Sequence, residues 1–168
     1  MTEAKSFLTQ IPEETKRLLE LKFVIYTDGS CDDKGNGGWA AYIIDNRNRK
    51  TTLKGSAQNT TNNRMEMTAI IEAFEFVYAK FDDNVKPYVC IELYSDSTYC
   101  TNTLKEWIHA WVKTAFDKRP NSDLLKKVYD FVFKYEKNLT ITWLPRNSTE
   151  QLTLCDQIAN QMRTTIEV

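Results

Sequence analysis

The chain has 168 residues, of which 42% are hydrophobic and 27% are charged, and its formal net charge is −1 at pH 7. This length and composition are typical of one globular domain with a sizeable core, and no apolar run reaches the length of a transmembrane helix. The near-zero net charge excludes a global positive field, so any nucleic-acid binding must come from a local patch.

The cysteine and histidine content bears on the cellular compartment of the protein and on the kinds of site that it can form. Four cysteines are scattered along the chain without a Cys-x-x-Cys pair, and the N-terminus lacks the apolar segment of a signal peptide. We therefore expect an intracellular protein with reduced thiols. The single histidine, His109, makes a zinc site or a serine-type triad difficult to assemble.

Residues 1–22 are expected to form an N-terminal arm with a short accessory helix, ahead of one domain over residues 23–168. Residues 12–21 are predicted to be helical, because Pro12 is followed by two acids that favour the positive end of the helix dipole. Residues 23–31 then form a strand. Its run of β-branched and aromatic residues requires burial on both faces, which places it in the middle of a sheet.

Asp28 interrupts this buried strand and is followed at once by Gly29. A charge at such a position is costly unless a partner, such as a metal ion, offsets it. The alternative is a hairpin turn, because Asp-Gly is a strong turn signal. The stretch alone leaves both interpretations open.

Residues 39–44 and 50–57 are predicted to be the second and third strands. Short polar and glycine-containing turns join the first three strands, which must therefore be antiparallel neighbours. No glycine-rich phosphate loop follows the first strand, and this argues against a nucleotide-binding fold.

Residues 63–80 are predicted to form an amphipathic helix, because apolar side chains recur from Met65 onward at helical spacing. Its start contains a second acid, Glu66. Asn63-x-x-Glu66 also fits a capping box, in which Glu66 only folds back on the helix start.

The fourth strand is predicted at residues 88–95, and helical segments follow at 97–104 and 106–112. Asp96 stands at the junction between strand and helix, where it is either a site residue or the N-cap of the helix. The second segment brings Trp107 and Trp111 next to the locally basic stretch 113–119. Such a surface suits nucleic-acid contact, with core packing and solvated charge as the alternative.

A helix at 122–137 leads into the fifth strand at 139–144, and Ser148-x-x-Gln151 fits the capping-box start of a last helix. Asp156 lies at the border of the apolar stripe of that helix. The order βββαβαααβα, with two long crossovers, predicts an α/β fold. Its five-stranded mixed sheet has three antiparallel strands followed by two parallel ones, flanked by helices on both faces, with the first strand beside the fourth at the centre.

This arrangement lets four carboxylates converge at one edge of the sheet. They are Asp28, Glu66, Asp96 and Asp156. Carboxylates that share a site repel each other unless cations are present, and such hard oxygen ligands suit Mg²⁺. Two ions about 3.5–4 Å apart stabilise the attacking and leaving oxygens of an in-line phosphoryl displacement. The sequence therefore predicts metal-dependent phosphodiester hydrolysis.

Six sequence blocks carry a family resemblance and together span residues 23 to about 163. The blocks are Thr27-Asp28-Gly29-Ser30-Cys31, Gly37-Gly38-Trp39-Ala40, Thr60-Thr61-Asn62-Asn63-Arg64-Met65-Glu66, Ser95-Asp96-Ser97-x-Tyr99, Trp107-Ile108-His109-x-Trp111 and Cys155-Asp156-x-x-Ala159. In their types and order they resemble type 1 ribonuclease H, the ribonuclease HI family that includes the RNase H domains of reverse transcriptases. The block from Thr60 to Glu66 is the most specific.

The resemblance implies a ribonuclease H-like fold and an endonuclease that cuts the RNA strand of RNA–DNA hybrids, leaving 5′-phosphate ends. It implies that Asp28 bridges two Mg²⁺ ions, for which Mn²⁺ can substitute. Asp156 would help to hold the ion that activates the attacking water, and Glu66 and Asp96 the ion at the leaving oxygen. Substrate contacts are implied for nine further residues, Gly29, Ser30, Cys31, Thr61, Asn62, Thr98, Trp107, Trp111 and Arg146.

Departures from the family pattern bear on turnover and affinity, and two alternatives to a free nuclease stay open. The loop 145–149 has no histidine, and Thr98 stands where a glutamine is common. The chain is expected to act as a monomer, free or as part of a larger polymerase, and without a membrane partner. The alternatives are a non-catalytic hybrid- or RNA-binding module and an RNase H domain active only when tethered to a reverse transcriptase.

Overall fold

The computed structural model describes residues 21–113 and 118–165. The predicted helix at 12–21 lies outside the described residues, apart from Leu21, and so does most of the basic stretch 113–119. Leu21 is buried in the core, and its carbonyl accepts a hydrogen bond from the backbone N–H of Cys90 at 3.0 Å.

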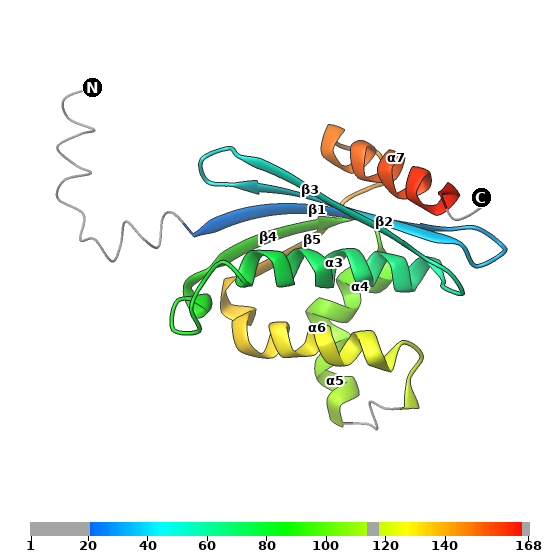
Figure 1. Cartoon of the computed structure of the whole chain (residues 1–168). Coiled ribbons are helices and arrows are strands. Elements are labelled where there is room, and N and C mark those ends of the chain that lie inside the picture. Colours follow the sequence, from blue (N-terminus) through cyan, green and yellow to red (C-terminus); the bar gives the residue numbers. More distant parts are fainter. Residues whose placement is uncertain (1–20, 114–117, 166–168) are drawn as a thin grey trace.

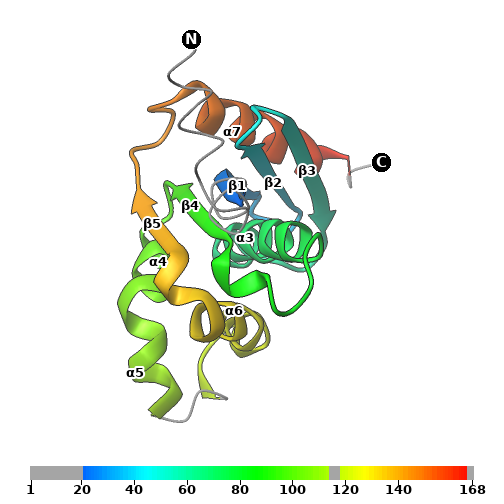
Figure 2. The ribbon, with the colours of Figure 1, turned by 90° about the vertical axis from the view of Figure 1, so that its left-hand side faces the viewer.

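Five strands form one mixed sheet in the order β3-β2-β1-β4-β5 (Figure 1 and Figure 2). The strands are β1 Lys22–Cys31, β2 Gly37–Asp45, β3 Lys50–Ala57, β4 Cys90–Ser95 and β5 Leu139–Trp143. The chain pairs β1 with β2 and β2 with β3 antiparallel, and it pairs β1 with β4 and β4 with β5 parallel. The predicted sheet, with the first strand central beside the fourth, is confirmed.

Helices cover both faces of the sheet, as expected. They are α3 Asn62–Tyr78, α4 Thr98–Asn102, α5 Ile108–Lys113, α6 Ser122–Tyr135 and α7 Glu150–Thr164. Figure 1 shows α7 on one face, with α3, α4 and α6 on the other and α5 farthest from the sheet. Of the helices in the two described ranges, none combines the length and the apolar character needed to cross a bilayer.

Two predicted elements differ in detail. The segments predicted at 97–104 and 106–112 are joined by a π-helical turn, Thr103–Trp107, which has no gap between it and α4 or α5. Hydrophobic periodicity does not reveal an i→i+5 turn. The predicted fourth strand begins two residues late, because Lys86–Tyr88 form a 3₁₀ turn around Pro87.

The main core lies between the sheet and the helices α3 and α6. Phe23 and Ile25 of β1 pack in one cluster with Phe74 of α3 and Val128 of α6. Alternating residues of β1 are buried on this side, and Thr27 continues the same alternation. The apolar run of β1 is therefore fully buried on this face, whereas Val24 and Tyr26 on the other face are only partly buried, which is less than the predicted burial on both faces.

Helix starts differ from the predicted capping boxes. Thr61 caps α3, accepting a hydrogen bond from the Arg64 N–H, and Ser97 caps α4, accepting one from the Cys100 N–H. Thr149, rather than Ser148, caps α7. Neither Glu66 nor Asp96 is therefore used as a cap, and both of those alternatives are wrong.

The hairpin interpretation of Asp28 is also wrong. β1 runs on to Cys31, and Asp28 is paired with Ala40 inside the antiparallel ladder. The turn lies farther on, where the Asp32 carboxylate accepts hydrogen bonds from the N–H groups of Lys34 and Asn36. The charge of Asp28 therefore lies inside the sheet and needs another explanation.

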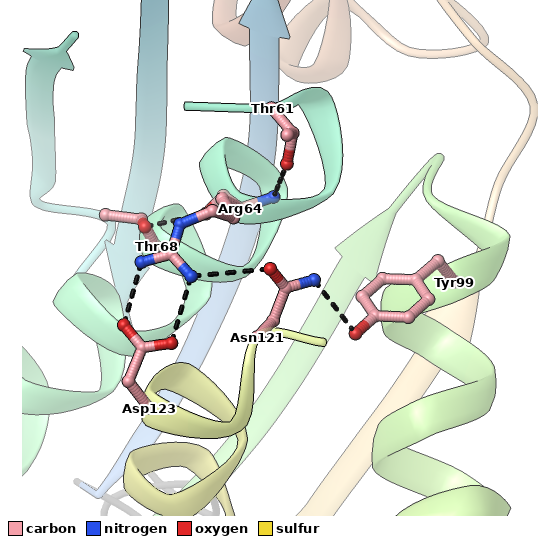
Figure 3. A network of polar contacts seen from close by, with 6 residues as sticks. All are labelled: Thr61, Arg64, Thr68, Tyr99, Asn121 and Asp123. Atoms are coloured by element: carbon pink, nitrogen blue, oxygen red, sulfur yellow. Dashed lines mark hydrogen bonds and ion pairs between the residues drawn. The ribbon is translucent and has the colours of Figure 1, made fainter. Parts of the chain in front are cut away.

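A polar network connects the start of α3 to α6 and α4 (Figure 3). The Arg64 guanidinium donates to both oxygens of Asp123 at 2.8 and 2.9 Å, and to Asn121 Oδ1 at 3.3 Å. Asn121, which has a positive φ of 64°, donates through its amide to the Tyr99 hydroxyl. A bidentate arginine–carboxylate pair has a defined geometry, so the network keeps the first turn of α3 in place.

Candidate active site

Parallel pairing of β1 with β4 brings two acids side by side. Thr27 of β1 is paired with Ser95, the last residue of β4. Asp28 and Asp96 are the next residues on each strand, and neighbouring strands lie about 4.8 Å apart. The strand register thus positions these two carboxylates.

Glu66 joins them because α3 approaches β1 very closely at Gly29. A Cβ atom at Gly29 would lie 2.3 Å from the backbone nitrogen of Glu66, a distance that only glycine avoids. As a result, one carboxylate oxygen from each of Asp28, Glu66 and Asp96 lies within 4.8 Å of the others. The exposed fractions of Asp28 and Glu66 are 4% and 8%, so these two carboxylates are largely removed from water, whereas Asp96 is only partly buried.

Asp156 reaches the same place from the other face of the sheet. At Gly38 of β2 a Cβ atom would lie 2.1 Å from the carbonyl oxygen of Ala159, so glycine is again needed for the helix, here α7, to lie against the strand. Asp156 lines the same cleft as the three other acids but is not part of their close group. Its Oδ1 lies 3.2 Å from Nη2 of Arg146.

The cleft has a volume of about 450 Å³ and contains most of the predicted site. Eleven residues line it: Asp28, Gly29, Ser30, Cys31, Asn62, Glu66, Asp96, Arg146, Asp156, Asn160 and Arg163. Four predicted contact residues lie outside this lining. Thr61 caps α3, Thr98 begins α4, and Trp107 and Trp111 pack on each other with ring centroids 5.6 Å apart.

Asn160 and Arg163 are cleft residues that the sequence prediction missed. Both are on α7 with Asp156, and four and seven residues after it they fall on the same helix face. The Ser30 hydroxyl donates to Asn160 Oδ1 at 2.6 Å and accepts from Arg163 Nη1 at 3.0 Å. Helical spacing from Asp156 was the signal that could have identified them.

Without a bound cation, burial and mutual repulsion raise the pKa values of these acids and favour their protonated forms. Burial, together with the charge of Asp96, raises the pKa of Asp28 to about 7, although a hydrogen bond with Glu66 and one from the Gly29 N–H oppose this. Burial and the neighbouring Asp28 raise the pKa of Glu66 well above its ordinary value. Burial also raises the pKa of Asp96, and nearby Arg146 partly offsets it.

The residues fit a divalent cation. Glu66 Oε2 is buried and has no hydrogen-bond partner among the described residues, an arrangement that is costly for an isolated carboxylate oxygen. The donor set consists of carboxylate oxygens, the hard ligands that Mg²⁺ and Mn²⁺ prefer. A bound cation would satisfy the free oxygen and remove the repulsion that raises these pKa values.

The raised pKa values predict the pH dependence of stability without metal. A group whose pKa is higher in the folded state binds more protons when folded, so its contribution is present at low pH and is lost as pH rises through the folded value. For Asp28 the loss extends from the ordinary value of 3.8 up to about 7. A shift of this size corresponds to ~4 kcal/mol at most.

In EDTA, we therefore expect the Tm of the wild type to fall between pH 5 and pH 8 by several degrees more than that of Asp28→Asn. Added Mg²⁺ should restore the wild type at pH 8. The control is Asp82→Asn, which removes an exposed acid at the other end of β1, where Phe81 packs on Phe23. Parallel Tm profiles for the wild type and Asp28→Asn would contradict this assignment.

Comparisons with known proteins identify the family. The family model described as RNase H matches residues 20–164. Ribonuclease H of Thermoanaerobacter sp. (strain X514) is 36% identical over 147 residues, which cover 82% of this chain and 86% of the relative. Ribonuclease HI of Rickettsia prowazekii (strain Madrid E) is 37% identical over 131 residues, covering 74% and 78%.

Solved structures share the fold. LC9-RNase H1, described as a type 1 RNase H with the type 2 active-site motif, superposes with a TM-score of 0.75 at 21% identity, covering 93% of this chain and 75% of that one. LC11-RNase H1, solved in complex with an RNA/DNA hybrid, gives 0.64 at 20% identity, covering 87% and 99%. Enzymes of this family depend on metal ions, and this chain holds the acidic cluster that such an ion requires. The chain therefore belongs to the ribonuclease H family of enzymes.

Proposed function

We propose that this ribonuclease H hydrolyses the RNA strand of RNA–DNA hybrids in the cleft beside Asp28, using two Mg²⁺ ions and leaving 5′-phosphate ends. The observation that carries the proposal is the close group of three carboxylates, two of them buried, in which one Glu66 oxygen has no hydrogen-bond partner in the part of the chain that the structure describes. A relative by fold, LC11-RNase H1, has been solved with an RNA/DNA hybrid, which supports the same class of substrate.

Each acid has a role that follows from its place in the cleft. Asp28, at the centre and nearly fully buried, would ligate both ions. Glu66 and Asp96 would complete the ligands on the leaving-oxygen side, and Asp156, which stands apart from their close group, would serve the side of the attacking water. Bound Mg²⁺ supplies the charge that stabilises the attacking and leaving oxygens of an in-line displacement.

The substrate contacts form part of the same proposal. Gly29, Ser30 and Cys31 of β1 line the cleft and are available to the RNA strand and its neighbouring groups, and Asn62 of α3, which also lines it, would hold a phosphate of the DNA strand together with Thr61. A 2′-hydroxyl next to Glu66 would let the enzyme distinguish RNA from DNA. For the DNA strand we propose Thr61, Thr98 and the paired indoles of Trp107 and Trp111, all outside the cleft lining.

Cleavage of a labelled hybrid by the isolated chain tests the function. We expect Mg²⁺-dependent, EDTA-sensitive cutting of the RNA strand, with single-stranded RNA and both homoduplexes left intact. Binding without cleavage at any metal concentration would identify the chain as a non-catalytic module. Foamy virus protease–reverse transcriptase shares the fold over 93% of this chain but only 21% of its own length, so cleavage that appears only after fusion to a polymerase would favour a tethered domain.

The ion pair between Arg146 and Asp156 leads us to expect tighter Mg²⁺ binding when Arg146 is removed. Its guanidinium lies 3.2 Å from the Asp156 carboxylate, whose side chain is 19% exposed, and so competes with a cation for that ligand. An ion pair of this exposure is worth up to ~1 kcal/mol. We therefore expect Arg146→Ala to bind Mg²⁺ about two- to fivefold more tightly in a calorimetric titration without hybrid.

Arg49→Ala is the matched control, since Arg49 is paired with Asp45 at the end of β2 remote from Asp28. It should leave Mg²⁺ affinity unchanged. Equal or weaker Mg²⁺ binding by Arg146→Ala would show that Arg146 does not oppose the cation.

The proposal extends to assembly and location. We propose that the chain works as a monomer inside the cell, with Mn²⁺ able to replace Mg²⁺. All four cysteines are free, and Cys100 and Cys155 are buried, which suits a reducing compartment. Size-exclusion chromatography with light scattering measures the assembly state directly.

A further inference from the structure

One part of the cleft carries positive charge and is not explained by the metal site. Ser30, Asn160 and Arg163 line it beside the acids. Ser30 lies two residues after Asp28, so the two side chains leave the same side of β1 about 6.6 Å apart. We refer to these three residues as the donor cluster.

The hydrogen bonds within the donor cluster hold the Arg163 guanidinium, which carries its positive charge, in one orientation. The Ser30 hydroxyl bonds in both directions, because it donates to Asn160 Oδ1 at 2.6 Å and accepts from Arg163 Nη1 at 3.0 Å. Ser30 is 8% exposed, so this connection is largely protected from water. The remaining N–H groups of Arg163 and the amide N–H₂ of Asn160 are left as donors toward the cleft.

No acid of the described residues forms a direct ion pair with Arg163, and among the same residues its guanidinium hydrogen bond is to Ser30. Asp32, whose pKa the charge of Arg163 lowers, already accepts from the Lys34 and Asn36 N–H groups and from the Asn36 amide. The pKa of Asp32 is lowered mainly by the Asn36 N–H, and Arg163 contributes least. Within the described ranges, Arg163 is thus a cation that Ser30 holds in place without an ion-pair partner.

We propose that Arg163, oriented by Ser30 and Asn160, binds a phosphate of the RNA strand one or two nucleotides from the phosphate that is cut. The proposal rests on the function proposed above, because the cut phosphate must lie at Asp28. Arg163 is held at Ser30, which lies about 6.6 Å along β1 from Asp28, a spacing similar to that between neighbouring phosphates of one strand, so a phosphate close to the cut one can reach the guanidinium. The planar guanidinium matches two phosphate oxygens at once, and the amide of Asn160 adds a further donor.

Binding in EDTA tests the proposal apart from catalysis. Affinity for a labelled hybrid is measured by fluorescence anisotropy over a series of salt concentrations for the wild type, Arg163→Gln, Arg163→Lys and Arg49→Gln. We expect Arg163→Gln to weaken binding about tenfold and to reduce the slope of log K against log salt by about 0.9, the value for one phosphate. Arg163→Lys should keep the slope and lose only part of the affinity, and Arg49→Gln should match the wild type.

Replacement of single phosphates in the hybrid by neutral methylphosphonate linkages locates the phosphate that Arg163 contacts. One linkage at a time is placed in the RNA strand or the DNA strand. We expect a single RNA position at which neutralisation weakens the wild type but no longer affects Arg163→Gln. In Mg²⁺ the same variant should raise KM about tenfold while kcat stays within about twofold, because the acids are unchanged.

Unchanged affinity and slope for Arg163→Gln, or a coupled position in the DNA strand, would overturn the proposal. A fall in kcat without a change in KM would also overturn it. A wild type that neither binds nor cuts the hybrid would refute the proposed function, whereas a competent wild type with an unaffected Arg163→Gln would refute only this phosphate contact.

Discussion

Replacing Asp28 with asparagine is expected to abolish RNA cleavage while leaving the fold and hybrid binding largely intact. Asp28 is the acid at the centre of the cleft, next to Asp96 across the parallel strand pair and close to Glu66. An amide keeps the shape of the side chain but removes the negative charge that two cations would share. The measured rate in Mg²⁺ should fall by more than about 10²-fold.

The control for this experiment is Asp82→Asn, which makes the same chemical change in the loop after α3, beside the end of β1 that is remote from the cleft. It should cut hybrids at the wild-type rate. Circular dichroism and hybrid affinity in EDTA show whether Asp28→Asn remains folded and able to bind. A rate above a few per cent of wild type in a folded Asp28→Asn protein would refute the assignment of Asp28 as the shared ligand.

Gly29→Ala is expected to damage stability and catalysis together. The added methyl group would lie 2.3 Å from the backbone nitrogen of Glu66, so the first turns of α3 must move rather than a flexible side chain. Overpacking of this kind costs about 1–3 kcal/mol, seen as a lower Tm. A shift of Glu66 by about 1 Å should reduce kcat by about 10²-fold.

Gly35→Ala separates the two effects. Gly35 has a φ of +83°, so alanine is strained there, but its nearest neighbour would be 3.5 Å away. It should lower Tm by a similar amount and leave kcat near the wild-type value. If Gly29→Ala lost stability but kept kcat, Glu66 would not depend on the close approach of α3.

The sheet was predictable because its signals are local or follow from chain order. Short turns join β1, β2 and β3, and the crossovers to β4 and β5 are long enough for parallel pairing. The proximity of Asp28 and Asp96 follows from the same topology, since Asp28 of β1 lies beside the carboxyl end of β4, and Asp96 is the residue after that end. Three of the four acids are in fact within one close group, and Asp156 is in the same cleft.

The helix caps and side-chain contacts that the sequence did not reveal depend on competition between neighbouring residues, on loop conformation or on contacts between distant parts of the chain. Thr60, Thr61, Asn62 and Asn63 are all acceptable N-caps, and the backbone selects Thr61. The position of Arg146 over Asp156 depends on the loop conformation, in which Asn147 has a φ of 57°. The donor cluster joins β1 and α7 across 130 positions of sequence, a contact that no single stretch of the chain reveals.

The placement of α7 has a consequence for how the nuclease is made. This helix supplies Asp156, Asn160 and Arg163, and it covers its face of β1 and β2 alone among the described helices (Figure 2). On a ribosome it emerges last of the described elements, and the roughly 60 residues from Asp96 to Asp156 take about 3–12 s at about 5–20 residues per second. During that interval the nascent chain carries three acids without the fourth or the complete donor cluster, so we expect the ability to cut RNA only when synthesis has passed α7.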